Sequence, residues 1–484
     1  MSFTHLHVST AFSAHYGVSW PDELAQAAAA DGATALACTD RNGLYGTVKH
    51  LKACMAAGLD PVVGVDLAVY DDDGDLRTQL AGRVVVLAHG HNKGAGYRAL
   101  CRLISDAHAR TSGKAGGVVP VAVTRAEIAS RALHPETLEP VLTVLVGPDS
   151  DVGRAMSGRR YLRPRTLFKQ WLDSMPKGTV AAEVVSHLSA PGEPLSTAHA
   201  VRMLKLAAEH GVPAVLTNAV RYCAEDGAAT ADVLDSARTL KSLTELTEEP
   251  LLQPNGRGWL KTSAQMLELG KEVIHAAGYG ATDLTRLLGQ TEALADRCRM
   301  DPVADMGWKQ PVVPEASVIG IDGDPLVELT KRCEAGISRR FPGISGRPEA
   351  EMRARLEHEL RIIANLGFAS YFLTVAEVSR MILDMGVRAA ARGSGASSLV
   401  NYLIDVSQVN PLQHDLIFER FLSRDRATLP DIDIDVDQVV DQAGSPGSAG
   451  GGPDPHVQDH SGDLCDGQEV GGEAQRVDDP ELVL

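Results

Sequence analysis

The sequence lacks several features that would assign it to an easily recognised class. Its 484 residues contain no run of about 18 apolar residues, the length that crosses a membrane. The N-terminal MSFTHLHVSTAF has no basic region followed by an apolar stretch, so we expect no signal peptide. The seven cysteines are odd in number, and none forms a CxxC pair. This pattern argues against a disulfide framework and a cysteine zinc site, and it predicts a cytoplasmic protein with reduced thiols.

The C-terminal segment lacks aromatic side chains. Residues 437–484 contain no Phe, Tyr or Trp, and they carry eleven acidic residues against one base, Arg476. About −10 of the net charge of −17 therefore belongs to this segment, whereas residues 331–427 hold 14 Lys or Arg against 11 Asp or Glu. With so little to bury, residues 437–484 are predicted to be a disordered acidic tail. The overall acidity is thus weak evidence about partners.

Helix and strand signals alternate through the first 275 or so residues. In SWPDELAQAAAADG, Pro21 favours a helix start and Gly32 a helix stop, and the following TALACTD is typical of a short buried strand. VRMLKLAAEHG and PAVLTN repeat this order, and VVVLA and LTVLVG add two strands. The pattern predicts an α/β domain with parallel strands, for which a barrel is one form. Asp40 and Asn218 fall at carboxyl ends of strands, where barrel enzymes place their chemistry.

A helical, polar connector is predicted for residues 276–346, and an amphipathic helix follows in RPEAEMRARLEHELRIIANLG (347–367). One face of that helix carries four apolar residues, Met352, Leu356, Leu360 and Ile363. The i,i+4 spacing predicts two ion pairs, Glu351 with Arg355 and Glu357 with Arg361. A second helix is predicted in YFLTVAEVSRMILDMG, ending at Gly386.

A glycine- and serine-rich turn, ARGSGASSLVNYLIDV (391–406), runs into an apolar helix. Small residues let backbone amides approach a phosphate, and a helix N-terminus adds partial positive charge. Arg392 adds a bidentate donor for phosphate oxygens. Taken alone, an ordinary turn with a serine N-cap accounts for the same residues equally well.

The stretch ATLPDIDIDVDQVV (427–440) places Asp431, Asp433 and Asp435 at alternate positions. In an extended strand these side chains share one face. Asp is uncommon in strands and the like charges repel, so the arrangement needs compensation. Two Mg²⁺ ions about 3.5–4 Å apart, as used in phosphoryl transfer, would provide it. The alternative is an exposed edge strand with a solvated acidic face.

At this point the residues resemble a known family. The run from GFASYFL to PDIDIDV, with RGS, NPL and FERFL between them, closely resembles the palm of the bacterial C-family DNA polymerases. That family comprises the alpha subunit of DNA polymerase III and its error-prone relative. The N-terminal FTHLHVSTAFS resembles the polymerase-and-histidinol-phosphatase (PHP) domain that precedes this palm. The resemblance covers residues 1 to about 436.

The resemblance implies a fold of several parts. An N-terminal PHP-type α/β barrel with a degenerate metal site is expected over residues 1–275. The helical connector over residues 276–346 leads to a partial polymerase-beta-like α+β palm over residues 347–436. The acidic tail over residues 437–484 comes last.

The resemblance also implies a set of functional residues. Asp431 and Asp433 match the family's catalytic, Mg²⁺-binding palm carboxylates, and Asp435 matches the third acidic position of the same motif. Gly393 and Ser394 match the turn that holds the incoming nucleotide's phosphates, with Arg392 and Arg420 as phosphate partners. In intact relatives the partners are a DNA primer–template, a deoxynucleoside triphosphate and replisome subunits. No membrane partner is expected.

The PHP region departs from the family pattern at many ligand positions. Ser9, Arg41, Arg83, Pro148, Ala219 and Arg221 stand where metal ligands are usual. The remaining candidates are His7, Asp40, Asp66, Glu183 and His187. With so many ligands replaced, the PHP metal cluster is expected to be lost and the domain to be structural.

The palm departs from the pattern after Val436. The family's third catalytic aspartate lies on a later strand, and that strand, the fingers, the thumb and the clamp-binding region have no counterpart here. We therefore expect a polymerase alpha subunit truncated by a frameshift or deletion, with little or no activity. One alternative function is a PHP-type metal-dependent phosphoesterase or proofreading nuclease. Another is a non-catalytic remnant or binding module.

Overall fold

The computed structural model describes residues 2–70, 80–109, 120–157, 162–193, 195–246, 255–310, 312–424 and 428–436. The chain divides into two compact units, the first ending at Pro314 and the second beginning at Glu315. The predicted connector, residues 276–346, spans this division. The predicted acidic tail, residues 437–484, lies outside the described residues.

The first unit is built on a seven-stranded sheet in the order β1-β2-β3-β5-β6-β7, with β4 beside β2. The strands are β1 (Ala35–Arg41), β2 (Asp60–Tyr70), β3 (Leu80–Ala88), β4 (Ala122–Val123), β5 (Leu142–Val146), β6 (Val180–Val185) and β7 (Ala214–Thr217). Most neighbours are parallel, as the sequence predicts, but β3 runs antiparallel to both β2 and β5. The prediction of parallel strands is therefore wrong for β3. Because β3 begins so soon after β2, the connection is too short for a helical crossover of a dozen or more residues.

The N-terminal segment connects the two edges of this sheet. The amides of Ala37 and Thr39 in β1 donate to the carbonyls of His5 and Val8, at 3.0 and 2.8 Å. On its other side the segment pairs with Val220 beyond β7 through a parallel bridge. Residues 5–9 therefore lie between the first and last strands and give the sheet its barrel-like closure. This places His7 and Ser9 beside the carboxyl ends of β1 and β7.

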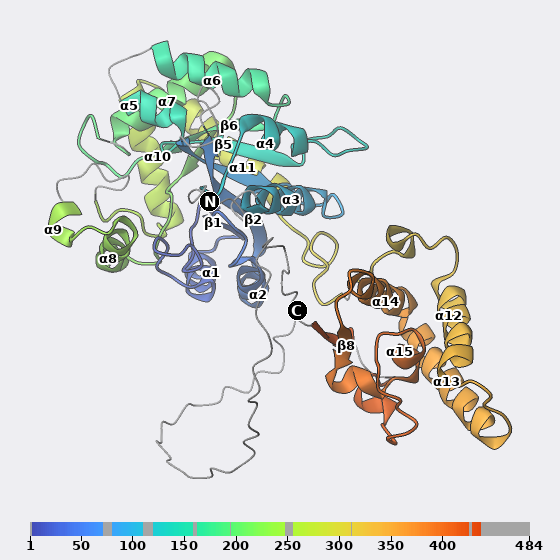
Figure 1. The fold of residues 1–484 in the computed structure, drawn as a ribbon. Coiled ribbons are helices and arrows are strands. Elements are labelled where there is room, and N and C mark those ends of the chain that lie inside the picture. Colours follow the sequence, from blue (N-terminus) through green and yellow to red (C-terminus); the bar gives the residue numbers. More distant parts are fainter. Residues whose placement is uncertain are drawn as a thin grey trace, which may run out of the picture. The chain divides into compact units, whose positions relative to one another are not determined.

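Helices surround the sheet of the first unit (Figure 1). They are α1 (Pro21–Ala30), α2 (Thr47–Ala57), α3 (Ala95–Ala109), α4 (Arg125–Arg131), α5 (Asp151–Ser157), α6 (Leu162–Ser174), α7 (Thr197–His210), α8 (Gly227–Thr239), α9 (Leu243–Leu246), α10 (Ser263–Ala277) and α11 (Ala281–Cys298). Pro21 opens α1 and Gly211 closes α7 in the left-handed conformation, as the sequence signals predict.

Alternate residues of the strands face two different cores. Val63, Val65 and Leu67 of β2 pack in the large outer core with residues of α3, α7 and α10. On the other face, Val62 and Val85 pack inside the sheet against Leu294 and Cys298 of α11. The period of two along each strand thus fills both sides of a buried sheet. The strand ends that carry the polar residues are held on this packed scaffold.

The second unit is mainly helical, with a two-stranded sheet. Its elements are η1 (Ala316–Ile319), α12 (Pro325–Arg340), α13 (Arg347–Leu366), α14 (Ala369–Asp384), β8 (Ala389–Arg392), η2 (Gly393–Ser397), α15 (Leu399–Leu403), η3 (Phe418–Arg420) and β9 (Asp433–Val436). Helices α12 to α15 gather near β8 (Figure 1). Among the described residues no single helix is long and apolar enough to cross a membrane, and the bent pair α13–α14 passes that test on length and composition only.

The two predicted helices are confirmed as α13 and α14, followed by Gly367 and Gly386 with φ of +71° and +77°. The predicted pair of Glu357 with Arg361 forms, at 2.9 Å. The predicted pair of Glu351 with Arg355 is wrong. Instead Glu351 pairs with Arg347, and Arg355 pairs with the buried Glu359. Arg355 therefore faces the protein, not the solvent.

Candidate functional site

Three of the five predicted PHP residues meet at the carboxyl ends of the strands. His7, Asp66 and Glu183 line one cavity, together with Arg41 and Arg83. The other two predicted residues do not join them. Asp40 accepts hydrogen bonds from Thr10 and Ser13. The Nε2 of His187 forms a hydrogen bond with the carbonyl of Asn218 at 2.8 Å. The sequence correctly placed Asp40 at a strand end but not the direction of its carboxylate.

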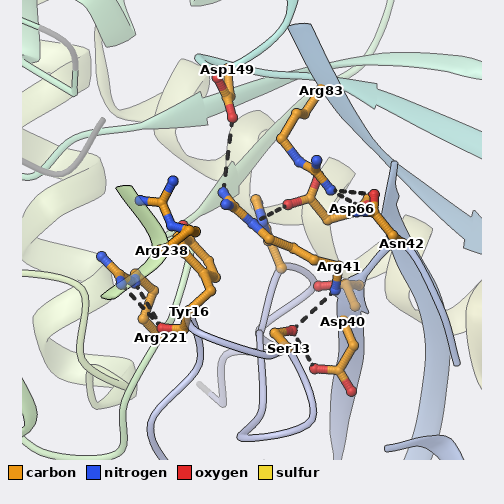
Figure 2. Close-up of polar contacts among 12 residues, drawn as sticks. Ser13, Tyr16, Asp40, Arg41, Asn42, Asp66, Arg83, Asp149, Arg221 and Arg238 are labelled. Atoms are coloured by element: carbon orange, nitrogen blue, oxygen red, sulfur yellow. Dashed lines mark hydrogen bonds and ion pairs between the residues drawn. The ribbon is translucent and has the colours of Figure 1, made fainter. Parts of the chain in front are cut away.

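Asp66 is held by two arginines. Arg41 Nε donates to Oδ2 at 3.0 Å, and Arg83 Nε donates to Oδ1 at 2.9 Å. Burial alone would raise the pKa of Asp66, but the two guanidinium groups lower it below its ordinary value. Arg83 also donates to the side chain of Asn42, which fixes its direction (Figure 2). Both oxygens that would bind a metal therefore carry an arginine.

His7 and Glu183 form a second pair, with Nδ1 of His7 2.7 Å from Oε1 of Glu183. Burial lowers the pKa of His7, but the Glu183 carboxylate and the nearby Asp66 together raise it, so the net pKa is above the ordinary value. The same Oε1 accepts from Thr217 at 2.6 Å. Gly147 permits this arrangement, because a Cβ there would lie 1.8 Å from Oε2 of Glu183.

An aromatic ring joins these pairs to a further set of charges. Tyr16 lies between two guanidinium groups, with the Arg41 carbon 3.3 Å and the Arg221 carbon 4.0 Å from its ring centre. Arg221 in turn makes a bidentate pair with Asp235 of α8, at 2.9 and 3.0 Å. Figure 2 shows Tyr16 close to Arg41 and Arg221. Arg41 and Arg221 both stand at positions where the sequence predicted lost ligands.

These residues do not fit the PHP metal cluster. The ligand oxygens of Asp66 and the Nδ1 of His7 already have protein partners, and the remaining cavity of about 20 Å³ has room for about one water. Within the described ranges, no group of three or more His, Cys, Asp or Glu side chains is placed to hold a metal ion. Ser9, buried where a ligand is usual, has no hydrogen-bond partner for its hydroxyl.

The second site lies on the two-stranded sheet of the second unit. Strands β8 and β9 are antiparallel, and the register pairs Arg392 with Asp433 and Ala390 with Asp435. Asp433 and Asp435 are exposed, whereas Ile434 between them is partly buried. The alternation predicted for this stretch therefore holds over Asp433–Asp435, whereas Val436 is exposed like the two carboxylates. Asp431 lies just outside the strand, where the Tyr371 hydroxyl holds the preceding carbonyl of Pro430 at 2.7 Å.

The register brings the glycine turn beside the carboxylates. Gly393 follows Arg392 with φ of +66°, and a Cβ on it would lie 3.9 Å from Oδ2 of Asp433. Arg392 Nε lies 3.1 Å from Oδ2 of Asp435. The turn η2, which contains Ser394, also packs against η3, which carries the exposed Arg420. All the predicted palm residues except Asp431 thus belong to one β8–η2–β9 corner and the segment packed on it.

The carboxylates of this corner suit Mg²⁺. This ion is usually held by one or two carboxylates, with waters and substrate phosphates completing its coordination. Asp433 and Asp435 supply exposed oxygen ligands two residues apart on one strand. Asp431, Asp433 and Asp435 do not converge as a three-ligand cage, since the described residues contain none. The donor set therefore fits a site shared with a phosphate ligand.

One predicted feature of the turn is not observed. The sequence suggested that the helix following the turn offers its N-terminus to phosphate. That helix, α15, is only five residues long, and the first amides, of Leu399 and Val400, both donate to the carboxylate of Glu359. The end of α15 therefore offers no free Leu399 or Val400 amide to a phosphate, which leaves the turn and the arginines as the candidate donors.

Sequence reasoning missed the residues that surround the arginines of the first unit and the buried glutamate beneath the turn of the second unit. Asp149, Asp235 and Tyr16 were not singled out, although several arginines at ligand positions imply buried carboxylates nearby. Glu359 was also missed. Its signal was available, because Met352, Leu356, Glu359 and Ile363 lie on one helical face.

Two family models match the chain, one in each unit. The PHP domain matches residues 5–187, and the bacterial DNA polymerase III alpha NTPase domain matches residues 327–442. The chain is thus an α/β PHP domain joined to a polymerase region. An error-prone DNA polymerase from Symbiobacterium thermophilum is 34% identical over 90% of this chain. DNA polymerase III subunit alpha from Bacillus subtilis is 28% identical over 90% of this chain.

Over 90% of its length the chain is thus similar to the bacterial C-family DNA polymerases, which include the DNA polymerase III alpha subunit and the error-prone DNA polymerase. It spans 37% and 35% of the lengths of these two relatives. A putative metal-dependent phosphoesterase structure from Bifidobacterium adolescentis aligns with 58% of this chain and 98% of its own, at 15% identity and a TM-score of 0.31.

Proposed function

We propose that the second unit supplies the nucleotide- and metal-binding corner of a DNA-directed nucleotidyltransferase. The observation that carries this proposal is the β8–β9 register, which sets the Gly393 turn against Asp433. Arg392, Arg420 and the Gly393–Ser394 backbone would bind the triphosphate of a deoxynucleotide. Asp431 and Asp433, with Asp435, would hold Mg²⁺, which neutralises phosphate charge and aligns the attacking and leaving oxygens.

The chain's own residues perform binding and orientation in this proposal. Arginine is always charged and offers paired donors to phosphate oxygens. Arg392 forms an ion pair with Asp435. Both side chains are exposed, and ion pairs between exposed side chains are weak. It can therefore exchange the carboxylate for a phosphate at little cost. The Tyr371 contact to Pro430 fixes where the acidic segment enters this corner.

We expect these 484 residues to bind a nucleotide with Mg²⁺ but not to extend a primer. Nucleotidyl transfer needs a complete set of carboxylates, and errors on the order of 1 Å cost about a hundredfold in rate. In the described residues β9 pairs with β8 alone. Primer–template and replisome subunits are partners of such a polymerase through surfaces that the described residues do not identify.

Two assays on the 484-residue protein test this proposal. Fluorescent dATP with Mg²⁺ should bind, and the double variant Asp431→Ala/Asp433→Ala should lose that binding. Primed template with four deoxynucleotides and Mg²⁺ should show no extension above the same double variant. Absence of nucleotide binding would overturn the proposed site, and extension that the variant abolishes would overturn the proposed inactivity.

For the first unit we propose a structural role without bound metal. The competing function, a metal-dependent phosphoesterase or proofreading nuclease, is disfavoured because Arg41 and Arg83 occupy both oxygens of Asp66. Phosphoesterase assays with Mn²⁺ and Zn²⁺, together with metal analysis of the purified chain, test this role. Hydrolysis that depends on His7 and Asp66, with stoichiometric bound metal, would favour the competing function.

A further inference from the structure

The second unit buries one carboxylate that the proposed function does not use. Glu359 of α13 is fully buried, and its side chain accepts four hydrogen bonds. The donors are Arg355 Nε at 2.7 Å, Ser398 Oγ at 2.9 Å, and the amides of Leu399 and Val400 at 3.1 Å each. Burial raises the pKa of Glu359 even though these donors lower it. So costly a group is tolerated only because its acceptors are satisfied.

Three of the four donors, Ser398, Leu399 and Val400, lie where the turn η2 meets α15. Ser398 connects the turn η2 to α15, so Glu359 holds the C-terminal side of the turn that begins at Gly393. Arg355 extends this anchor, because its Nη2 donates to the carbonyls of Ser397 at 3.3 Å and Leu416 at 3.1 Å. Leu416 precedes η3, the segment of Arg420. One buried pair therefore fixes both the turn and the arginine segment.

The turn is also fixed through its carbonyls. The carbonyl of Ser394 accepts from Ser397 Oγ at 2.6 Å, and that of Gly395 accepts from Asn401 Nδ2 at 2.9 Å. In a trans peptide the following amide points the opposite way. The N–H groups of Gly395 and Ala396 are thus directed away from these partners, and Glu359 has already taken the amides of α15. The orientation of the turn, not the helix end, determines what a phosphate meets.

We infer that Glu359 and Arg355 are positioning residues for the nucleotide-binding turn. The inference rests on the proposed function and deepens it. The ligand is a deoxynucleoside triphosphate with a divalent cation, which neither residue contacts. Ionised Glu359 holds η2 and α15 in register with β9, and Arg355 links that register to η3. Loss of the charge frees the turn before it unfolds the unit.

The test compares Glu359→Gln with a variant of equal stability loss. Glutamine keeps the shape but brings an NH₂ donor against groups that are all donors. We expect affinity for fluorescent dATP with Mg²⁺ to fall at least tenfold, and amide hydrogen exchange over residues 393–400 to rise. Met352→Ala, on the same buried face of α13, should lower the melting temperature while leaving affinity within about twofold. Arg355→Lys keeps the charge but loses the paired guanidinium donors, so its affinity for fluorescent dATP should lie between those of the other two variants.

The readouts separate this inference from the function on which it rests. A wild-type chain that binds no dATP overturns the proposed function, and the exchange comparison then decides alone whether Glu359 orders the turn. A Glu359→Gln variant that matches Met352→Ala in affinity and exchange overturns the inference. If Glu359→Gln does not fold, Arg355→Lys is compared with Met352→Ala in the same way, with the same deciding outcomes.

Discussion

The two units carry acidic clusters that have opposite relations to cations. In the first unit the acidic groups are buried, and arginines from the same chain neutralise them, as Arg41 and Arg83 do for Asp66. In the second unit Asp433 and Asp435 are exposed, and one weak ion pair from Arg392 reaches them. Buried carboxylates with internal cations have no need of a metal, whereas exposed ones remain available to it. Similar residue types thus give a closed electrostatic core in one unit and an exposed acidic strand in the other.

The largest difference between the units should appear when one carboxylate is neutralised. Asp66→Asn removes the carboxylate that Arg41 and Arg83 share, and it leaves Arg41 only the more distant Asp149, 3.9 Å away. We expect a loss of about 3 kcal/mol in the free energy of unfolding. All four tryptophans precede residue 315, so their fluorescence during urea unfolding reports on the first unit. Asp173→Asn, which removes an exposed partner of Lys169, should cause no measurable change. A small effect of Asp66→Asn would mean that the arginines are better solvated than the structure shows.

The open site should instead respond through binding. Asp433→Asn is expected to weaken the affinity for fluorescent dATP with Mg²⁺ at least tenfold, equivalent to about 1.4 kcal/mol. Asp384→Asn, at an exposed position of α14, is the matched control and should leave affinity within about twofold. Equal losses in the two variants would show that overall charge, not the β8–β9 corner, attracts the nucleotide.

The pH dependence of stability distinguishes an internal pair from a metal centre. The pKa of His7 is raised in the folded state, so its pair with Glu183 stabilises fully below the unfolded pKa of about 6.5. That contribution is lost as the pH rises through the raised folded pKa. A metal centre would behave in the opposite sense, because its ligands must be deprotonated.

We therefore expect tryptophan-monitored stability to decline from pH 6.5 to 8.5 in the wild-type chain. His7→Gln should remove that decline. Added chelator should change neither curve. Stability that rises with pH and falls with chelator would instead indicate bound metal.

The smallest effect on stability is expected from Asp435→Asn, which is the same type of substitution as Asp66→Asn but at an exposed position. Asp435→Asn breaks the pair with Arg392, whose side chains are 72% and 61% exposed. We expect the free energy of unfolding of the second unit to change by no more than about 0.5 kcal/mol. Amide hydrogen exchange in α12, α13 and α14 can follow this unit. A loss above 1 kcal/mol would show that Asp435 is structural, which would weaken its assignment to the metal site.

The sequence predicted individual elements well, because their signals are local. Pro21 and Gly367 define a helix start and a helix end, and alternation in β9 follows from strand geometry. The antiparallel direction of β3 was missed, since buried strands of either direction consist of the same apolar residues. Arg392, Gly393 and Asp433, which were all named from the family motif, lie together where β8 pairs with β9. These positions are close in the corner, so the motif carries most of the geometry.

Partners distant in the sequence could not be predicted in the same way. Nothing near Arg221 indicates that it would stack on Tyr16 and bind Asp235. The pairing of Arg355 with Glu359 rather than Glu351 depends on which helix face is buried. An i,i+4 pattern is equally compatible with both directions along the helix. Tertiary packing decides between them.

The stack of Arg41, Tyr16 and Arg221 also limits how the first unit could change over evolution. Each arginine pairs with a buried carboxylate, Asp66 or Asp235, that a second arginine also holds. A single replacement by histidine would therefore weaken a buried ion-pair network before any ligand set was complete. Intermediate sequences would be less stable than either end state and would still lack a functional centre. Regaining metal chemistry therefore requires several coordinated replacements. The arginine-filled centre therefore resists stepwise conversion to a metal site.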